Sequence, residues 1–148
     1  MRVGCLAGCV DVLDTKVLRD AHGCQFVIKL VSHLNWTQIE DLLPAGSHVF
    51  LADSSPSRNP TEPCIVDYTE PCYAERSHTV LVVGGETEGL SRSARQLYTS
   101  GRWNTRRVHI PMSLGVDSLN SAVSASIILY EIYRQMTMTS VTHNTQQS

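Results

Sequence analysis

Residues 79–90 read TVLVVGGETEGL, an aliphatic run that ends abruptly in two glycines. A continuous run of this kind is typical of a strand that is buried on both faces of a parallel sheet. Glycines directly after such a strand let a ligand approach the backbone, because no Cβ atom stands in the way. Since open α/β sheets bind ligands at the carboxyl ends of their strands, this turn is the first candidate site.

The same turn also has a purely structural interpretation. Glu86 can be a solvated carboxylate in the first turn of a helix, near the positive end of the helix dipole. The pattern is neither G-x-G-x-x-G nor G-x-x-x-x-G-K-[ST]. A Rossmann-type dinucleotide site and a phosphate loop are therefore disfavoured.

A second stretch, residues 108–136, reads VHIPMSLGVDSLNSAVSASIILYEIYRQM. It predicts a short strand over Val108–Ile110, a loop, and a long helix over Ser118–Met136. Apolar residues surround most of this helix, which predicts burial on most of its sides. Asn120 and Ser121 in its first turn suit a ligand that needs a close backbone and a few hydrogen bonds, but they also suit an ordinary helix start.

Further strands and helices alternate along the remaining chain. Strands are predicted at Val3–Val10, Cys24–Val31 and His48–Ala52, and helices over Thr15–Ala21, Trp36–Leu43 and Ser91–Tyr98. Asn35 and Gln38 have the spacing of a capping box at the start of the second of these helices. Strands separated by helices predict an α/β fold with a mainly parallel sheet flanked by helices.

Length and composition predict one globular domain. The chain has 148 residues, of which 42% are apolar and 18% charged. Its formal net charge of -2 gives no overall attraction to nucleic acids or membranes. Residues 53–78 hold four prolines and predict a loop insertion, and the polar residues 137–148 predict a flexible tail.

The cysteines and the apolar runs exclude two classes of protein. None of the five cysteines forms the paired C-x-x-C spacing of a zinc site, and the six histidines show no ligand spacing either. No apolar run reaches the roughly 20 residues that a membrane span needs. We therefore predict no metal, no membrane and reduced thiols inside a cell or organelle.

Taken together, GGETEGL and IPM-x5-SLN closely resemble the second and third motifs of the SpoU (TrmH) branch of the SPOUT RNA 2′-O-ribose methyltransferases. The third motif of that family leads into an alanine-rich helix that ends in an aromatic–glutamate pair, as Tyr130 and Glu131 do here. The stretch GVDSLNSA and the insertion before TVLVVGGE look most like those of the mitochondrial large-subunit rRNA methyltransferases. The resemblance predicts a methyltransferase domain over residues 1–136.

The resemblance implies transfer of a methyl group from S-adenosyl-L-methionine to a ribose 2′-hydroxyl of RNA. It also implies a C-terminal trefoil knot and a homodimer built largely from the last helix. By the same resemblance the cofactor would be held by Gly84, Ile110, Met112 and Leu119. The substrate and the groups around it would be positioned by Glu86, Ser118 and Asn120.

One family motif is not found in this sequence. The family's first motif, N-x-G-x-x-x-R, contains the arginine that is assigned to activating the ribose hydroxyl. We therefore expect a fragment, splice form or truncated gene product, whose own activity is open. The alternative to an active enzyme is a catalytically inactive, dimeric RNA-binding or interaction module of the same fold.

A local cluster of arginines is the one sequence feature that indicates RNA contact. Arg92, Arg95 and Arg106, with two further arginines, fall within sixteen residues around Trp103. Arginine suits phosphate contact and an aromatic ring suits base stacking. A solvated helix and loop explain the cluster equally well. The resemblance implies a mitochondrial location. Without that resemblance, the expected location is cytoplasmic.

Overall fold

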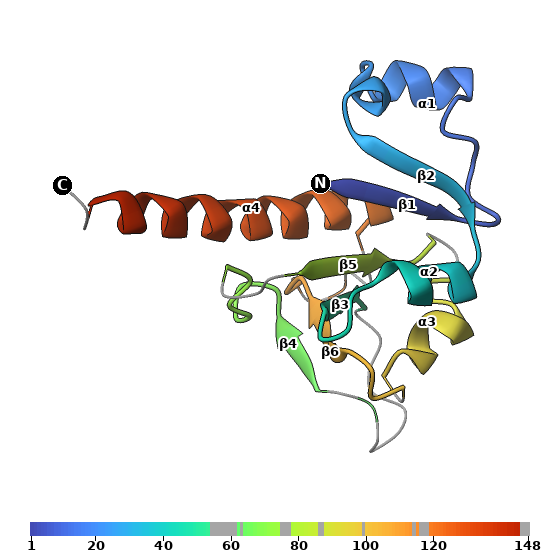
Figure 1. Cartoon of the computed structure of the whole chain (residues 1–148). Coiled ribbons are helices and arrows are strands. Elements are labelled where there is room, and N and C mark those ends of the chain that lie inside the picture. Colours follow the sequence, from blue (N-terminus) through green and yellow to red (C-terminus); the bar gives the residue numbers. More distant parts are fainter. Residues whose placement is uncertain are drawn as a thin grey trace. The chain divides into compact units, whose positions relative to one another are not determined.

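The computed structural model describes residues 1–53, 62, 64–74, 78–85, 88–98, 100–113, 115 and 119–145, the last seven of these by their backbone only. The chain divides into two compact units, Met1–Leu43 and Pro44–Ser148, where its length predicted a single domain. Each unit combines parallel strands with helices, and Figure 1 labels these elements.

The first unit is a pair of parallel strands with two short helices. Strands β1 (Arg2–Leu6) and β2 (Lys29–Leu34) pair directly. Helix α1 (Thr15–Asp20) is capped by the side chain of Asp14. Helix α2 (Trp36–Leu42) has the predicted capping box. In it, Asn35 and Gln38 exchange two hydrogen bonds of 2.9 Å.

The strand predicted over Cys24–Val31 is wrong in its first half. Residues Cys24–Phe26 form a single 3-10 turn, η1, after Gly23, whose φ of 81° turns the chain. The side chains of Phe26 and Val27 are 76% and 87% exposed. Their high β-propensity is therefore not realised, because no neighbouring strand of this unit covers them.

The first strand is also shorter than predicted, since it ends at Leu6 rather than Val10. Gly8 has a φ of 98°, and the N–H of Cys9 donates to the carbonyl of Leu6 over 3.1 Å. This tight turn ends the strand.

The second unit contains a four-stranded sheet in the order β4-β6-β3-β5, and every neighbouring pair is parallel. Its strands are β3 (His48–Ala52), β4 (Ile65–Asp67), β5 (Thr79–Val83) and β6 (Asn104–His109). The predicted mainly parallel sheet is confirmed, and β3 and β5 have their predicted bounds. Ala52 lies opposite both Val83 and Val108, so three strands end together at one edge.

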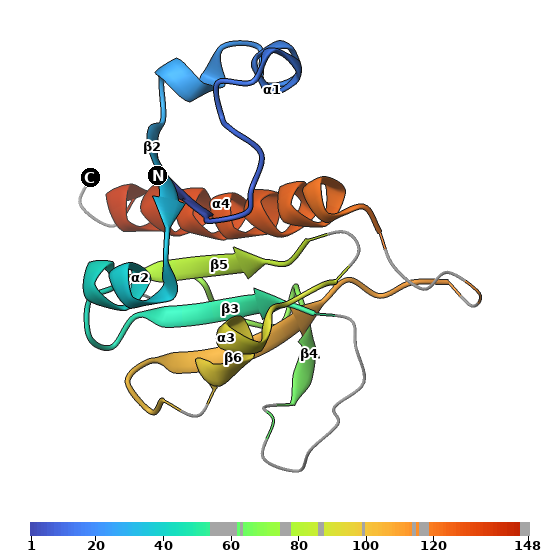
Figure 2. The same cartoon turned by 90° about the vertical axis from the view of Figure 1, so that its right-hand side faces the viewer.

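Helix α4 (Ser121–Thr145) runs alongside β5, as Figure 2 shows, and packs against one face of this sheet. Its residues Ile128 and Ile132 enter a core cluster with Phe50, Val108 and Tyr73. The rings of Phe50 and Tyr73 meet edge to face with centroids 4.7 Å apart. This cluster is the main apolar core beneath the helix.

The other face of the sheet carries α3 (Arg92–Gln96). Side chains alternate along a strand, so Val49, Leu51 and Asp53 point away from the face that holds Phe50. Val49 and Leu51 are fully buried. Arg95 of α3 donates a 3.0 Å hydrogen bond to Asp53, which fixes the helix to this face.

Strand β6 begins at Asn104, four residues before the predicted Val108. The missed part contains Arg107, whose side chain is fully buried. Its guanidinium donates from Nη2 to Asp53 Oδ2 over 3.0 Å and from Nη1 to Glu62 Oε2 over 3.1 Å. A charged residue in a sequence normally indicates exposure, so the buried Arg107 caused the first four of the six residues of this strand to be missed.

The segment predicted as a loop insertion, residues 53–78, contains strand β4 and a packed stretch after it. Tyr73 is fully buried, and its hydroxyl donates to the carbonyl of Tyr68 over 2.8 Å. The N–H of Tyr73 donates to Gln135 of α4 over 2.8 Å, and the Gln135 amide donates back to the carbonyl of Pro71. These two hydrogen bonds therefore hold the stretch against α4.

Helix α4 differs from its prediction at both ends and in its burial. It begins at Ser121 rather than Ser118, and it runs through Thr145, so the tail expected from Thr137 is helical to that point. Tyr130 and Tyr133 are 68% and 63% exposed, although burial on most sides was expected. One side of this apolar helix is covered by the sheet, and its opposite side faces solvent.

We expect Arg107→Met to lower the free energy of unfolding of the second unit by about 3–5 kcal/mol, because it leaves two acidic side chains without their shared cation. Arg106→Met is the matched control, since Arg106 is the neighbouring residue and is exposed. It should change stability by less than about 0.5 kcal/mol. Urea unfolding checks both values, and similar effects of the two substitutions would contradict a structural role for the Arg107 ion pairs.

Candidate ligand-binding site

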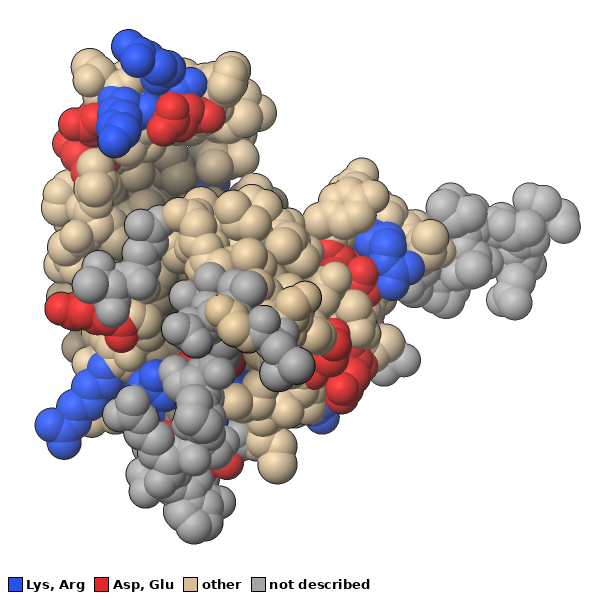
Figure 3. Space-filling model, turned by 180° about the vertical axis from the view of Figure 1, so that it is seen from behind, with Lys and Arg blue, Asp and Glu red and all other residues tan. Residues whose placement is uncertain are grey.

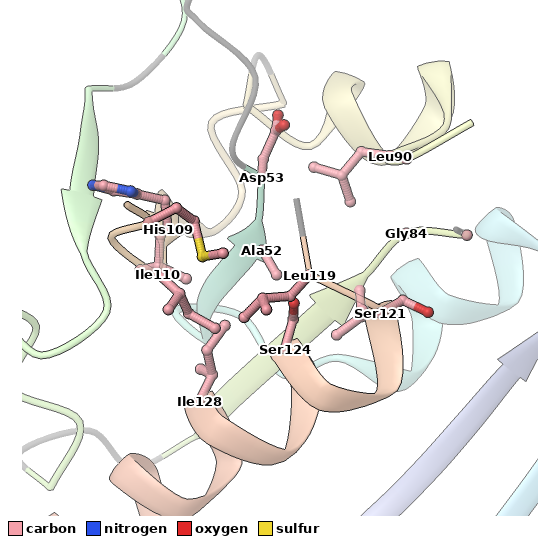
Figure 4. Close-up of a pocket in the computed structure, with 15 residues that line it drawn as sticks. Ala52, Asp53, Gly84, Leu90, His109, Ile110, Leu119, Ser121, Ser124 and Ile128 are labelled. Carbon is pink, nitrogen blue, oxygen red and sulfur yellow. The ribbon is translucent and has the colours of Figure 1, made fainter. Parts of the chain in front are cut away.

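A cavity of about 200 Å³ lies where β3, β5 and β6 end and α4 begins. Figure 4 shows its lining side chains, which come from all four elements and from the segments that follow the strands. The lining consists of Ala52, Asp53, Val83, Gly84, Gly85, Gly89, Leu90, Val108, His109, Ile110, Met112, Leu119, Ser121, Ser124 and Ile128.

The four residues predicted to hold a cofactor all line this cavity. Gly84 follows β5, Ile110 and Met112 follow β6, and Leu119 precedes α4. These segments are separated in the sequence, and the parallel sheet brings them to one edge. Their meeting in one cavity is the main geometric result for this site.

The backbone around Gly84 explains why a glycine stands there. A Cβ atom at this position would collide with the carbonyl group of Gly89 and would lie 2.6 Å from the nitrogen of Leu90. Two hydrogen bonds between Gly85 and Gly89, of 3.2 and 3.0 Å, hold the returning chain in this place. The absence of a side chain at residue 84 is thus required by the protein's own turn.

Gly85 differs from Gly84 because the protein's own backbone leaves room for a side chain there. A Cβ atom built on it meets no heavy atom within 4 Å, and Gly85 lines the cavity. A side chain at this position would therefore meet no steric obstacle in the protein itself. Gly84, which the family resemblance selected, lines the same cavity.

The chemistry of the lining suits a flat apolar group with polar edges. Ile110, Met112 and Leu119 supply apolar surface, and Ser121 and Ser124 supply hydroxyl groups at the start of α4. Ligand sites commonly combine a mainly apolar wall with a few polar groups that set orientation. The residues present fit an adenosine-containing ligand in these respects.

Several lining residues were missed by the sequence analysis. Asp53 is the first residue after β3, and His109 is the last residue of β6. The rule that ligands bind at the carboxyl ends of strands would have found both. Asp53 was passed over because it opens the segment predicted as an insertion, and His109 because only metal-ligand spacing was considered.

Of the three residues predicted to act on the substrate, Glu86 and Ser118 lie outside the described residues. Asn120 caps α4, because its Oδ1 accepts hydrogen bonds from the N–H groups of Ala122 and Val123 over 2.9 and 3.2 Å. Its chain neighbours Leu119 and Ser121 line the cavity. Asn120 thus stands beside the site and orders the helix start there.

The predicted RNA-binding arginines lie in different environments. Arg92 and Arg106 are exposed, whereas Arg95 is 28% exposed and forms an ion pair with Asp53. Trp103 is only 6% exposed, so the expectation that it stacks on bases is contradicted. Its ring is covered by the protein and by the guanidinium of Arg102, 5.1 Å from the ring centroid. In the view of Figure 3, the basic side chains of the described residues form small separate groups and no single continuous patch.

Tyr98 lies near the ion pairs of Asp53, Arg95 and Arg107. Burial raises the pKa of Tyr98 to about 12, so its phenol is neutral at physiological pH. Its hydroxyl is buried and has no hydrogen-bond partner among the described residues. The phenol therefore adds no charge to this cluster.

The described residues show neither a metal site nor a membrane-spanning helix. They contain no group of three or more His, Cys, Asp and Glu side chains that could hold a metal ion. In that same part of the chain, no helix is both long and apolar enough to cross a membrane.

Comparison with known proteins identifies the family. The model of the SpoU rRNA Methylase family matches residues 3–130. The chain is 34% identical to rRNA methyltransferase 3B, mitochondrial, of Danio rerio and to rRNA methyltransferase 3, mitochondrial, of Xenopus laevis. These matches cover 87% of this chain, which spans 39% and 41% of the two relatives.

Solved structures share the fold. The SpoU methyltransferase AviRb from Streptomyces viridochromogenes, in complex with the cofactor AdoMet, is 25% identical with a TM-score of 0.70. That likeness covers 90% of this chain and 49% of the other. Because the family model matches most of the sequence and the family's motif residues meet at one cavity, this chain belongs to the SpoU rRNA methylase family.

Proposed function

We propose that the protein binds S-adenosyl-L-methionine in the cavity and transfers its methyl group to a ribose 2′-hydroxyl of RNA, most simply ribosomal RNA. The observation that carries this proposal is the meeting of Gly84, Ile110, Met112 and Leu119 around one cavity. The AdoMet complex of a similar methyltransferase and the names of the relatives support it.

The residues of this chain bind and orient the reactants. Ile110 and Met112 would hold the adenine by backbone and packing contacts, and Leu119 would close the pocket. The hydroxyl groups of Ser121 and Ser124 offer hydrogen bonds at the start of α4. When bound, the cofactor supplies the activated methyl group on its sulfonium. Holding the ribose oxygen in line with that methyl group supplies a large part of the rate. Glu86, Ser118 and Asn120 remain our proposed positioning residues for the substrate.

The proposal includes a homodimer in which α4 forms much of the interface, and a knotted C-terminal part. Val123, Tyr130 and Tyr133 share one side of α4 by helical spacing, and all three are exposed. Exposed aromatic residues next to one another are typical of protein interfaces. A mitochondrial location also belongs to the proposal, because the relatives carry it in their names.

We expect the chain to bind S-adenosyl-L-methionine with micromolar affinity in calorimetry, and Ser124→Trp to abolish binding because the indole fills the cavity. Thr37→Trp is the control, since Thr37 is an exposed residue of α2 that does not line the cavity. Circular dichroism shows whether each variant is folded. Equal binding by the two folded variants would contradict the assignment of the cavity.

Arg92→Gln and Arg106→Gln should each weaken binding of a labelled ribosomal RNA fragment. Each should also reduce the slope of log K against log salt concentration by about 1, which corresponds to the loss of one phosphate contact. Both side chains are exposed, so they are available for phosphate groups. Arg134→Gln is the control, because it removes the same charge from a side chain that is held by Glu131 on α4. Filter binding at several salt concentrations measures these slopes. An equal loss in all three variants would indicate only a general charge effect.

The double substitution Tyr130→Glu/Tyr133→Glu should convert the dimer to a monomer, because it places charges on the proposed apolar interface. Sedimentation velocity measures the change in mass. Phe26→Glu is the control, since Phe26 is an exposed aromatic residue of the first unit. A dimer that survives the double substitution would rule out this side of α4 as the interface.

A further inference from the structure

Asp53 gives the cavity its negative charge. It is the one carboxylate among the described lining residues, and no lysine or arginine occurs among them. The other described side chains of the lining are apolar, are hydroxyl groups, or belong to His109. In Figure 4, Asp53 and Leu90 lie at one end of the lining and Ile128 at the other, so the charge is local.

The carboxylate is nearly withdrawn from water and is held in place by two cations. Its side chain is 4% exposed. Arg107, which is fully buried, and Arg95, which is 28% exposed, both donate to Oδ2 over 3.0 Å. Burying an ionised carboxylate is costly unless such partners compensate it. The two arginines therefore compensate the charge of Asp53 at the end of the cavity.

These charges act more strongly in the cavity than they would on a surface. Electrostatic energies rise as the effective dielectric constant falls, and this site is lined mainly by apolar groups. Asp53 belongs to the cavity lining, whereas neither of the two arginines that bind its Oδ2 does. Asp53 is therefore the member of this charge cluster that lies nearest to the cavity.

We infer that Asp53 is a specificity-determining residue that makes the cavity favour a cationic ligand over its neutral analogue. The inference rests on the proposed function, in which the ligand is S-adenosyl-L-methionine. Methyl transfer breaks the S–CH3 bond and forms an O–CH3 bond, and the hydroxyl proton passes to solvent water. The sulfur keeps the bonding electron pair and becomes a neutral thioether in S-adenosylhomocysteine. A negative cavity thus distinguishes the substrate cofactor from its product and assists product release.

Arg95 adjusts this preference. It lies at the more exposed side of Asp53, and its positive charge offsets part of the carboxylate's field. Removing Arg95 leaves the ion pairs of Arg107 with Asp53 and Glu62 in place. The two substitutions Asp53→Asn and Arg95→Met break the same salt bridge but change the charge at the cavity in opposite directions.

The test is calorimetric measurement of the dissociation constants of both ligands for wild type, Asp53→Asn, Arg95→Met and the control Arg92→Met. The measured quantity is the dissociation constant of S-adenosylhomocysteine divided by that of S-adenosyl-L-methionine. This ratio should fall about fivefold in Asp53→Asn and rise about twofold or more in Arg95→Met, as charge changes near a weakly screened site predict. Arg92 is exposed on the same helix, so its removal should leave the ratio unchanged.

The possible outcomes separate the two proposals. If wild type binds neither ligand, the proposed function fails and the inference fails with it. If wild type binds S-adenosyl-L-methionine but the ratio is constant, or shifts in one direction in both variants, only the role of Asp53 is overturned, since a purely structural salt bridge predicts that result. If Asp53→Asn does not fold, Arg95→Met decides alone, and a ratio that falls or stays constant overturns the inference.

Discussion

A buried arginine in the middle of a parallel sheet is the constraint on which the second unit depends. Arg107 lies on β6 between β3 and β4, and its partners Asp53 and Glu62 stand at the two ends of one chain segment. A buried guanidinium is tolerated only where its charge is matched, so these contacts fix where the segment after β3 leaves and returns. The same carboxylate borders the cavity, which links the stability of the sheet to the charge of the site.

The parallel arrangement explains how the site forms from distant parts of the sequence. Three strands end at one edge, and the segments that follow them supply backbone and apolar side chains to one cavity. The start of α4 closes that cavity, because Asn120 caps the helix next to Leu119 and Ser121. Small and polar residues at this helix start therefore have both a capping role and a position beside the ligand.

Much of the fold followed from the sequence where local signals were strong. The apolar runs of β3 and β5 and the capping box of α2 were predicted with correct bounds or contacts, because period and capping chemistry are local. The predictions failed where tertiary contacts override local preference, as at Arg107 and at the exposed Phe26 and Val27. The residues expected to hold the cofactor came from motif resemblance and line one cavity, whereas Asp53 was missed although its position at the end of a strand could have indicated it.

The steric closure around Gly84 affects how sequence variation at this motif should be interpreted. Any side chain at this position meets the backbone of Gly89 and Leu90, so selection would retain glycine here even in a relative that had lost all ligand binding. An invariant glycine at residue 84 is therefore no evidence of activity. Gly85, which has room for a side chain beside the cavity, is the position where replacement would indicate that the demand for a ligand had been relaxed.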